Sequence, residues 1–174
     1  MLVGHSYGGM VITNAASGDP DVKSLVYIAA FAPNKGDTVL SLSALAPGGM
    51  LGPALGFRDV PVPGGQEGYI MPSAFREVFA ADVDRSTAAV MAASQRPAAV
   101  AALGEPSPND PAWKTIPSWY MVANRDNAIG AAPERIMAKR IGAKTVEVRS
   151  SHVPMITHPR EVTDLILDAA GSRH

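Results

Sequence analysis

Two continuous apolar runs of strand length constrain the fold of this chain more than any other feature. They are residues 24–30 (SLVYIAA) and 116–123 (IPSWYMVA). A strand with one face in water alternates apolar and polar side chains, whereas a parallel strand covered by helices on both faces reads as an unbroken apolar run. The two runs therefore predict an α/β fold built on a buried parallel sheet.

Helices and strands alternate on either side of these runs. A short apolar strand over residues 1–3 leads into an apolar helix that ends near Gly18, and a strand over 145–148 lies between predicted helices over 133–141 and 159–170. Strands that follow one another through helices pair in parallel by crossover connections. This order supports the same α/β class.

The middle of the chain has a different character. Proline and glycine are frequent in residues 34–71, which predicts a loop-rich excursion. Residues 72–81 and 84–94 then place apolar side chains at three- and four-residue spacing, which predicts two helices, and a shorter alanine-rich helix is expected over 97–103. These helices fit a cap better than they fit elements that cover a sheet.

The length of 174 residues is sufficient for one domain with a small cap. We assign residues 1–33 and 114–174 to the α/β core, and residues 34–113 to a helical cap inserted into it. The sequence contains no internal repeat or low-complexity tract.

Charge and composition exclude several classes of function. The formal net charge is -1 and no run of Lys or Arg occurs, so neither nucleic acid nor a membrane surface is an expected partner. Cysteine is absent, the histidines lack paired ligand spacing, and no phosphate loop is present, so no metal or other cofactor is expected. The start lacks the features of a secretory signal, and no apolar stretch reaches the roughly 18 residues that span a bilayer, which predicts a cytoplasmic protein.

Residues 4–8 (GHSYG) match the G-x-S-x-G pattern, in which a serine sits on a tight turn between a strand and a helix. Strained backbone at Ser6 would bring chain segments close together, so side chains at Gly4 and Gly8 are expected to collide there. The turn also places Ser6 at a helix N-terminus, where the backbone N–H of Tyr7 favours developing negative charge. Ser6 is the predicted nucleophile.

A serine hydroxyl needs a base, and the chain has four histidines. We favour His152, which follows a predicted strand and so lies at the carboxyl edge of the sheet. His5 is fixed inside the turn, His158 precedes a predicted helix, and His174 ends the chain. Asp126, at the end of another predicted strand, is the expected carboxylate that orients the base. The competing acids are less favoured, because they lie in a turn (Asp19, Asp21), on the helical cap (Asp82, Asp84) or on the polar face of the last helix (Asp164, Asp168).

Three blocks in this order resemble the α/β-hydrolase branch that contains plant methyl esterases, hydroxynitrile lyases and bacterial esterases. The blocks are residues 4–9 (GHSYGG), 123–129 (ANRDNAI) and 150–155 (SSHVPM), and the resemblance covers nearly the whole chain. It implies a serine hydrolase that acts on a small-molecule carboxylic ester, with a cap that sets substrate choice. His5, Tyr7 and Met155 adjoin the three candidate catalytic residues and are the candidates for oxyanion or substrate binding.

The resemblance also implies strands before the serine turn that this chain does not contain. Members of the branch take a second oxyanion donor from a loop between those strands, and here the Tyr7 N–H is the only donor that can be assigned. The strand that enters the turn would become an exposed sheet edge, which invites pairing with another chain. A truncated product, or a homodimer through that edge, is therefore expected.

Two other functions stay open. A hydroxynitrile-lyase-like cleavage would use the same three residues as a base and needs a positive group near the leaving cyanide, for which Lys35 and Lys114 are the candidates beside the cap. The absence of the first strands favours a different alternative, a non-catalytic remnant that binds a small apolar ligand or a partner chain.

Overall fold

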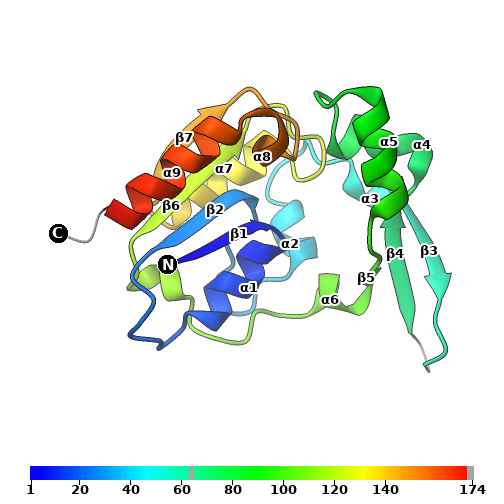
Figure 1. Cartoon of the computed structure of the whole chain (residues 1–174). Coiled ribbons are helices and arrows are strands. Elements are labelled where there is room, and N and C mark those ends of the chain that lie inside the picture. Colours follow the sequence, from blue (N-terminus) through cyan, green and yellow to red (C-terminus); the bar gives the residue numbers. More distant parts are fainter. Residues whose placement is uncertain (63–64, 172–174) are drawn as a thin grey trace.

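A four-stranded parallel sheet forms the core of the computed structural model, which describes residues 1–62 and 65–171 (Figure 1). The strand order is β1-β2-β6-β7, and the strands are β1 (Leu2–Ser6), β2 (Leu25–Ala30), β6 (Ser118–Ala123) and β7 (Lys144–Val148). Every residue of β2 and β6 is buried. The two apolar runs thus form the two central strands, and the predicted α/β class is confirmed.

Helices cover both faces of this sheet, as the unbroken apolar runs require. Alternate residues of each central strand point to opposite faces of the sheet. Tyr27 and Tyr120 pack with α1 (Gly8–Ala15) and α7 (Ala131–Arg140) on one face. The strand residues directly before and after each of these tyrosines pack with α9 (Pro159–Gly171) on the other face. The short helix α8 (Pro154–Thr157) precedes α9. None of the helices in the described part of the chain is long and apolar enough to cross a membrane.

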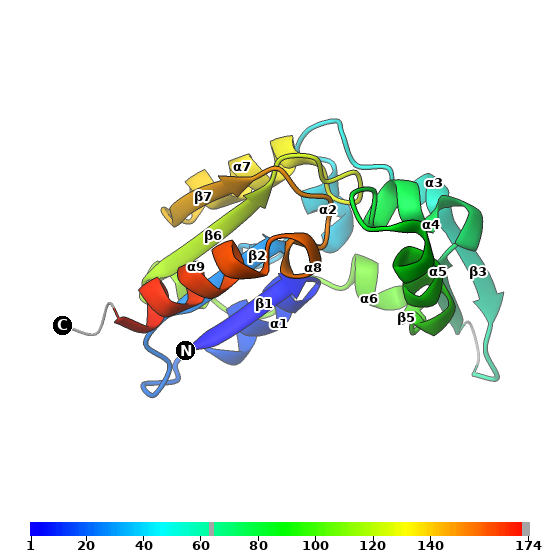
Figure 2. The same ribbon diagram turned by 45° about the horizontal axis from the view of Figure 1, so that its top comes forward.

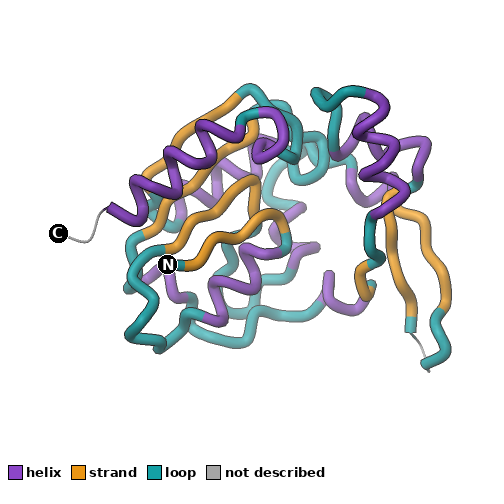
Figure 3. The backbone as a smooth tube through the Cα atoms, in the orientation of Figure 1, coloured by secondary structure: helices purple, strands orange, loops and turns teal. Residues whose placement is uncertain are grey.

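The inserted segment lies beside the carboxyl ends of the core strands (Figure 2). It contains helices and a three-stranded antiparallel sheet of order β3-β4-β5, which Figure 3 shows apart from the parallel sheet. Its elements are α2 (Val39–Ser43), α3 (Leu51–Ala54), β3 (Leu55–Asp59), β4 (Gln66–Ile70), α4 (Pro72–Phe79), α5 (Arg85–Ser94), β5 (Ala98–Ala99) and α6 (Ala101–Gly104), followed by the 3-10 helix η1 (Ala112–Lys114). We call residues 34–113 the cap.

The small sheet of the cap was not predicted: residues 34–71, expected to be a loop-rich excursion that disfavours regular elements, contain two of its strands and two short helices. Two glycines that favour turns in sequence lie inside its strands. Gly56 is paired with Tyr69, and a Cβ on Gly56 would lie 2.8 Å from the Tyr69 ring, which is too close. Gly68 is paired with Phe57, where a Cβ would lie at an ordinary contact distance of 3.5 Å from the ring. Gly56 therefore makes room for an aromatic ring on the neighbouring strand, whereas Gly68 only lies beside one.

The alanine-rich segment 97–103 is also only partly helical. Ala98 and Ala99 pair with β4, and the Val100 N–H donates to the Gln66 carbonyl, so the helix begins only at Ala101. Helix propensity of alanine is a weak preference of a few tenths of a kcal/mol up to about 1 kcal/mol per residue, and tertiary hydrogen bonds override it here.

Candidate active site

Ser6 lies at the junction of β1 and α1 in a strained conformation. Its φ is +53°, and the register between β1 and β2 shifts at this point, so that Ser6 faces Ala30. Ala29, on the adjacent strand, has φ +42°, and these two are the non-glycine residues with positive φ in the described chain. Backbone strain of this kind costs about 1–3 kcal/mol per residue and persists at functional sites.

Two glycines permit the close approach of chain segments at this turn. A Cβ on Gly4 would lie 2.6 Å from the Gly8 carbonyl oxygen, and a Cβ on Gly9 would lie 1.9 Å from the Phe31 carbonyl oxygen. The expected collision at Gly8 is wrong, because no described atom lies within 4 Å of a Cβ there. Gly8 begins α1 with its Cβ position open, whereas Gly9, one residue further, faces the end of β2.

We expect Gly9→Ala to destabilise the protein by about 3 kcal/mol, because the new methyl group overlaps the Phe31 carbonyl and the backbone must shift. Gly8→Ala is the matched control and should be neutral or stabilising by up to about 1 kcal/mol, since it replaces a helical glycine at an open position. Urea unfolding of both variants measures the difference. Equal stabilities would contradict the close approach at Gly9.

The structure brings Ser6, His152 and Asp126 together in one hydrogen-bonded chain. Ser6 Oγ lies 2.8 Å from His152 Nε2, and His152 Nδ1 lies 2.6 Å from Asp126 Oδ2. Asp126 follows β6 and His152 follows β7, so both come from the carboxyl edge of the sheet. With Nδ1–H donating to the carboxylate, Nε2 is free to accept the Ser6 hydroxyl proton.

Asp126 is buried and held from several sides. Oδ1 accepts hydrogen bonds from the N–H groups of Ala128 and Ile129, while Oδ2 faces His152. Burial alone would raise the pKa of Asp126, but the charge and hydrogen bond of His152, together with further hydrogen bonds from Glu134 and the Ala128 N–H, outweigh it and lower the pKa. Asp126 is therefore ionised at neutral pH.

His5 contacts His152 on the side of the imidazole that does not face the substrate. Its Nε2–H donates to the His152 carbonyl at 2.7 Å, and the two rings are 4.7 Å apart. Burial, followed by the positive charge of His152, lowers the pKa of His5 to about 4, against the weaker opposite effects of that hydrogen bond and of Asp126. His5 is therefore neutral at neutral pH.

This shift makes stability depend on pH. Above pH 6.5 His5 is neutral in both the folded and the unfolded chain; as the pH falls from 6.5 to about 4, only the unfolded chain takes up the proton. The free energy of unfolding should therefore fall with decreasing pH, by about 3 kcal/mol at most across that window. Urea unfolding of wild type and His5→Gln, which keeps an amide donor, checks this. The same pH dependence in both would contradict the assignment to His5.

A cavity of about 680 Å³ lies between the core and the cap, directly over Ser6 and His152. Its wall is mainly apolar, with Phe31 from the core and Leu55, Phe75 and Phe79 from the cap. The side-chain amide of Gln95 also lines it, but that amide is hydrogen-bonded to the backbone of Ile70. The cavity thus presents an apolar surface to a ligand next to the Ser6 hydroxyl.

Of the three other candidate binding residues, Tyr7 lines this cavity and the remaining two do not. Met155 packs against apolar residues of the core and the cap, and His5 lies behind His152. The Tyr7 N–H, beside Ser6 at the start of α1, donates to no protein acceptor in the described part of the chain. It is available to an oxyanion.

Asp82 also contributes to the site, although the sequence placed it on the cap among the unlikely acids. Its Oδ2 accepts hydrogen bonds from the Ser151 N–H at 3.0 Å and from the Thr157 hydroxyl at 3.1 Å. Burial would raise the pKa of Asp82, but these hydrogen bonds lower it. The cap is thereby tied to the segment that carries His152. No spacing in the sequence indicates this contact, because its partners are far apart along the chain.

Of the other histidines, His158 takes no part in the chain of hydrogen bonds. His158 lies between α8 and α9 with its Nδ1 3.0 Å from the Thr157 hydroxyl, and His174 lies outside the described residues. Within residues 1–62 and 65–171, no cluster of three or more potential metal ligands occurs.

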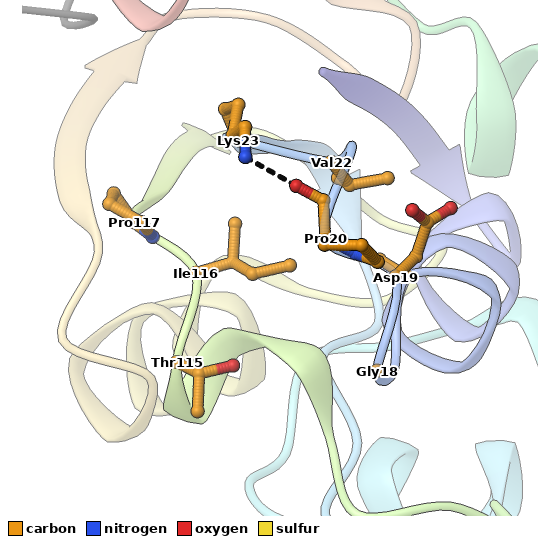
Figure 4. Close-up of a pocket in the computed structure, with 9 residues that line it drawn as sticks. Gly18, Asp19, Pro20, Val22, Lys23, Thr115, Ile116 and Pro117 are labelled. Carbon is orange, nitrogen blue, oxygen red and sulfur yellow. Dashed lines mark hydrogen bonds between the residues drawn. The ribbon is translucent and has the colours of Figure 1, made fainter.

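A second hollow, of about 380 Å³, lies at the opposite end of the strands (Figure 4). It joins the turn after α1 to the segment before β6, and Lys23 Nζ donates to the Pro20 carbonyl at its rim. Its lining contains neither serine nor histidine. We assign no chemistry to it.

The parallel sheet with helices on both faces, the strained serine turn and the cap define the class of protein. Residues 1–165 match the family model described as the alpha/beta hydrolase family, and the chain belongs to that family. The resemblance seen in the sequence is thereby confirmed.

Among curated proteins, a stretch of 43 residues is 56% identical to a carbendazim hydrolyzing esterase from Nocardioides sp. (strain SG-4G), covering 24% of this chain and 18% of that esterase. Among solved structures, polyneuridine aldehyde esterase superposes with a TM-score of 0.81 at 20% identity, over 97% of this chain and 71% of that one. A pyrethroid hydrolase from Sphingobium faniae JZ-2 gives a TM-score of 0.75 at 24% identity, over 99% and 70%. At these identities the structural likeness establishes the fold.

Proposed function

We propose that this chain is a serine hydrolase of carboxylic esters, with Ser6 as nucleophile, His152 as general base and Asp126 as the carboxylate that orients it. The observation that carries the proposal is the continuous chain of two hydrogen bonds, 2.8 Å and 2.6 Å, at the floor of an apolar cavity. The hydrolytic activities named for the similar esterases support the same reaction class.

The reaction follows from the order of these groups. His152 Nε2 takes the Ser6 proton while Oγ attacks the ester carbonyl carbon, and the negative charge on the carbonyl oxygen is stabilised by the Tyr7 N–H and the N-terminal end of α1. His152 then returns the proton to the departing alcohol, which leaves an acyl group on Ser6. Water, deprotonated by the same nitrogen, releases the acid and restores the hydroxyl. Asp126 stabilises the imidazolium form throughout.

The cavity favours an ester with an uncharged apolar group. Aromatic and aliphatic side chains from the cap surround the space above Ser6 and favour an apolar substituent there, while Arg96, an exposed cation in the same lining, disfavours a positively charged one. A small or aromatic ester fits this description.

The test is hydrolysis of p-nitrophenyl esters with acetyl, butyryl and benzoyl groups, together with labelling by a fluorophosphonate probe. We expect labelling of the protein and a kcat/KM that is higher for the more apolar butyryl and benzoyl esters than for the acetyl ester. No turnover and no labelling would overturn the proposed activity and favour the non-catalytic remnant that binds a ligand or partner.

No observation favours the lyase alternative. Neither Lys35 nor Lys114 is among the described residues that line the cavity, so neither is placed to receive a leaving cyanide.

A homodimer through the edge of the sheet remains a proposal: β1 is an edge strand, with β2 as its partner among the described strands.

A further inference from the structure

Glu134 is a buried acid on the apolar face of a helix. It lies in the first turn of α7 and shares its face with Met137, Ala138 and Ile141, at the spacing of one helical stripe. Its exposed fraction is 0%. A glutamate is almost never fully buried without a specific partner, so this position requires an explanation.

One of its oxygens has such a partner and the other has not. Oε2 accepts a hydrogen bond from the Ala123 N–H at 2.9 Å, at the end of β6. Oε1 is buried and faces no hydrogen-bond donor among the described residues. The neighbouring Arg135 does not neutralise the group, because its guanidinium pairs with Glu147 at 2.7–2.8 Å on the surface. An ionised Glu134 would thus hold a buried negative charge with a single donor, which is unfavourable.

Asp126 is the neighbouring acid whose carboxyl group interacts with the buried carboxyl of Glu134, and each of the two shifts the pKa of the other. Two carboxylates in contact cannot both be ionised at little cost, so the pair holds one proton at neutral pH. Asp126 has three other donors, the N–H groups of Ala128 and Ile129 and His152 Nδ1, whereas Glu134 has one. The negative charge is better stabilised on Asp126, and the proton belongs on Glu134.

We propose that Glu134 is a neutral carboxylic acid that donates its proton in a hydrogen bond to Asp126, and that it is a positioning residue for the Ser6–His152–Asp126 chain. The charge that faces His152 is then one negative charge, located on Asp126. Glu134 thereby links the end of β6, through the Ala123 N–H, to the carboxylate that follows it.

The directions of the pKa shifts agree with this assignment. Burial, followed by the hydrogen bond to Asp126 and the negative charge there, raises the pKa of Glu134 well above its usual range, and the Ala123 N–H and the charge of Arg135 oppose this more weakly. The pKa of Asp126 is lowered, partly by the hydrogen bond from Glu134. Tyr120, the other titratable group near Glu134, is buried and its pKa is raised, so it stays neutral.

Infrared spectroscopy tests the protonation state without any enzyme assay. The difference spectrum between wild type and Glu134→Gln should show the C=O stretch of a protonated carboxylic acid at neutral pH, and the exposed control Glu161→Gln should not show it. If the wild-type spectrum shows that band only in acid, Glu134 is an ordinary carboxylate and the inference is wrong.

The consequence for catalysis rests on the proposed function and is tested by a pair of variants. Glu134→Gln keeps a neutral donor toward Asp126 and an acceptor for the Ala123 N–H, so kcat and the acid limb of the kcat/KM pH profile should be unchanged. Glu134→Met has a similar size and no donor, and should lower kcat by roughly 10- to 100-fold with little change in KM, an effect comparable to that of removing the hydrogen-bond partner that orients a metal-binding side chain.

These results separate the two proposals. A shift of the acid limb to lower pH in Glu134→Gln would show that the substitution removed a negative charge near His152, which overturns the neutral state. An unchanged kcat in Glu134→Met would overturn the positioning role. If wild type hydrolyses no ester while the infrared band is present at neutral pH, the proposed function fails and the protonation of Glu134 stands.

Discussion

Ser6→Ala should reduce kcat for ester hydrolysis by roughly 10⁴- to 10⁶-fold, because it removes the only hydroxyl within hydrogen-bond distance of His152 Nε2 in the described structure. The substitution leaves the cavity, His152 and Asp126 in place, so substrate binding should survive. Initial rates with p-nitrophenyl butyrate and labelling by a fluorophosphonate probe measure the two consequences, loss of turnover and loss of the covalent adduct.

Ser94→Ala is the matched control for that loss. Ser94 lines the same cavity, but its hydroxyl donates to the Val90 carbonyl of its own helix and has no histidine beside it. We expect wild-type labelling and a kcat within about twofold of wild type, as for an exposed substitution away from the chemistry. Full labelling of Ser6→Ala, or its loss in Ser94→Ala, would mean that a different hydroxyl is the nucleophile.

The core and the three-residue constellation could be predicted because their signals are local. Residues 25–30 and 119–123, in the two central strands, are apolar and buried at every position, and helices on both faces follow from that alone. Parallel strands place their carboxyl ends at one edge, so a serine at the end of β1, an aspartate after β6 and a histidine after β7 were expected to converge. Ser6, Asp126 and His152 do converge.

The cap sheet could not be predicted because glycine occurs both in turns and in strands that pack against a large side chain. In a single sequence Gly56 and Gly68 read as turn residues, and only the cross-strand neighbours Tyr69 and Phe57 give them a place in a strand. The close contact at Gly9 was missed for a similar reason, since its partner, the Phe31 carbonyl, belongs to another strand.

Glu134 was overlooked although the sequence contains a signal for it. An acid in the first turn of a helix is normally explained by the helix dipole, and this explanation conceals the fact that Glu134 shares a stripe with Met137 and Ile141. An acidic residue at an apolar position of a predicted helix is informative. Asp82, in contrast, is recognised only through its tertiary contact with the Ser151 N–H.

Asp126→Asn should lower kcat by roughly 10⁴-fold near neutral pH with little change in KM. The reason is the direction of one hydrogen bond. The carboxylate accepts from His152 Nδ1–H at 2.6 Å, which leaves Nε2 as an acceptor for the Ser6 hydroxyl. An asparagine amide group turned toward His152 would donate to Nδ1 instead, so the ring proton would move to Nε2 and the imidazole could no longer accept the Ser6 proton.

The size and shape of the side chain are unchanged in this variant, and its amide oxygen can still accept from the N–H groups of Ala128 and Ile129. Thermal unfolding should therefore show a folded protein, and Asp164→Asn, an exposed aspartate on α9, should retain wild-type kcat. Stopped-flow and steady-state rates with p-nitrophenyl butyrate measure the loss. A reduction of less than about tenfold would show that His152 reaches the reactive tautomer without a carboxylate at position 126, and orientation by Asp126 would then not be part of the mechanism.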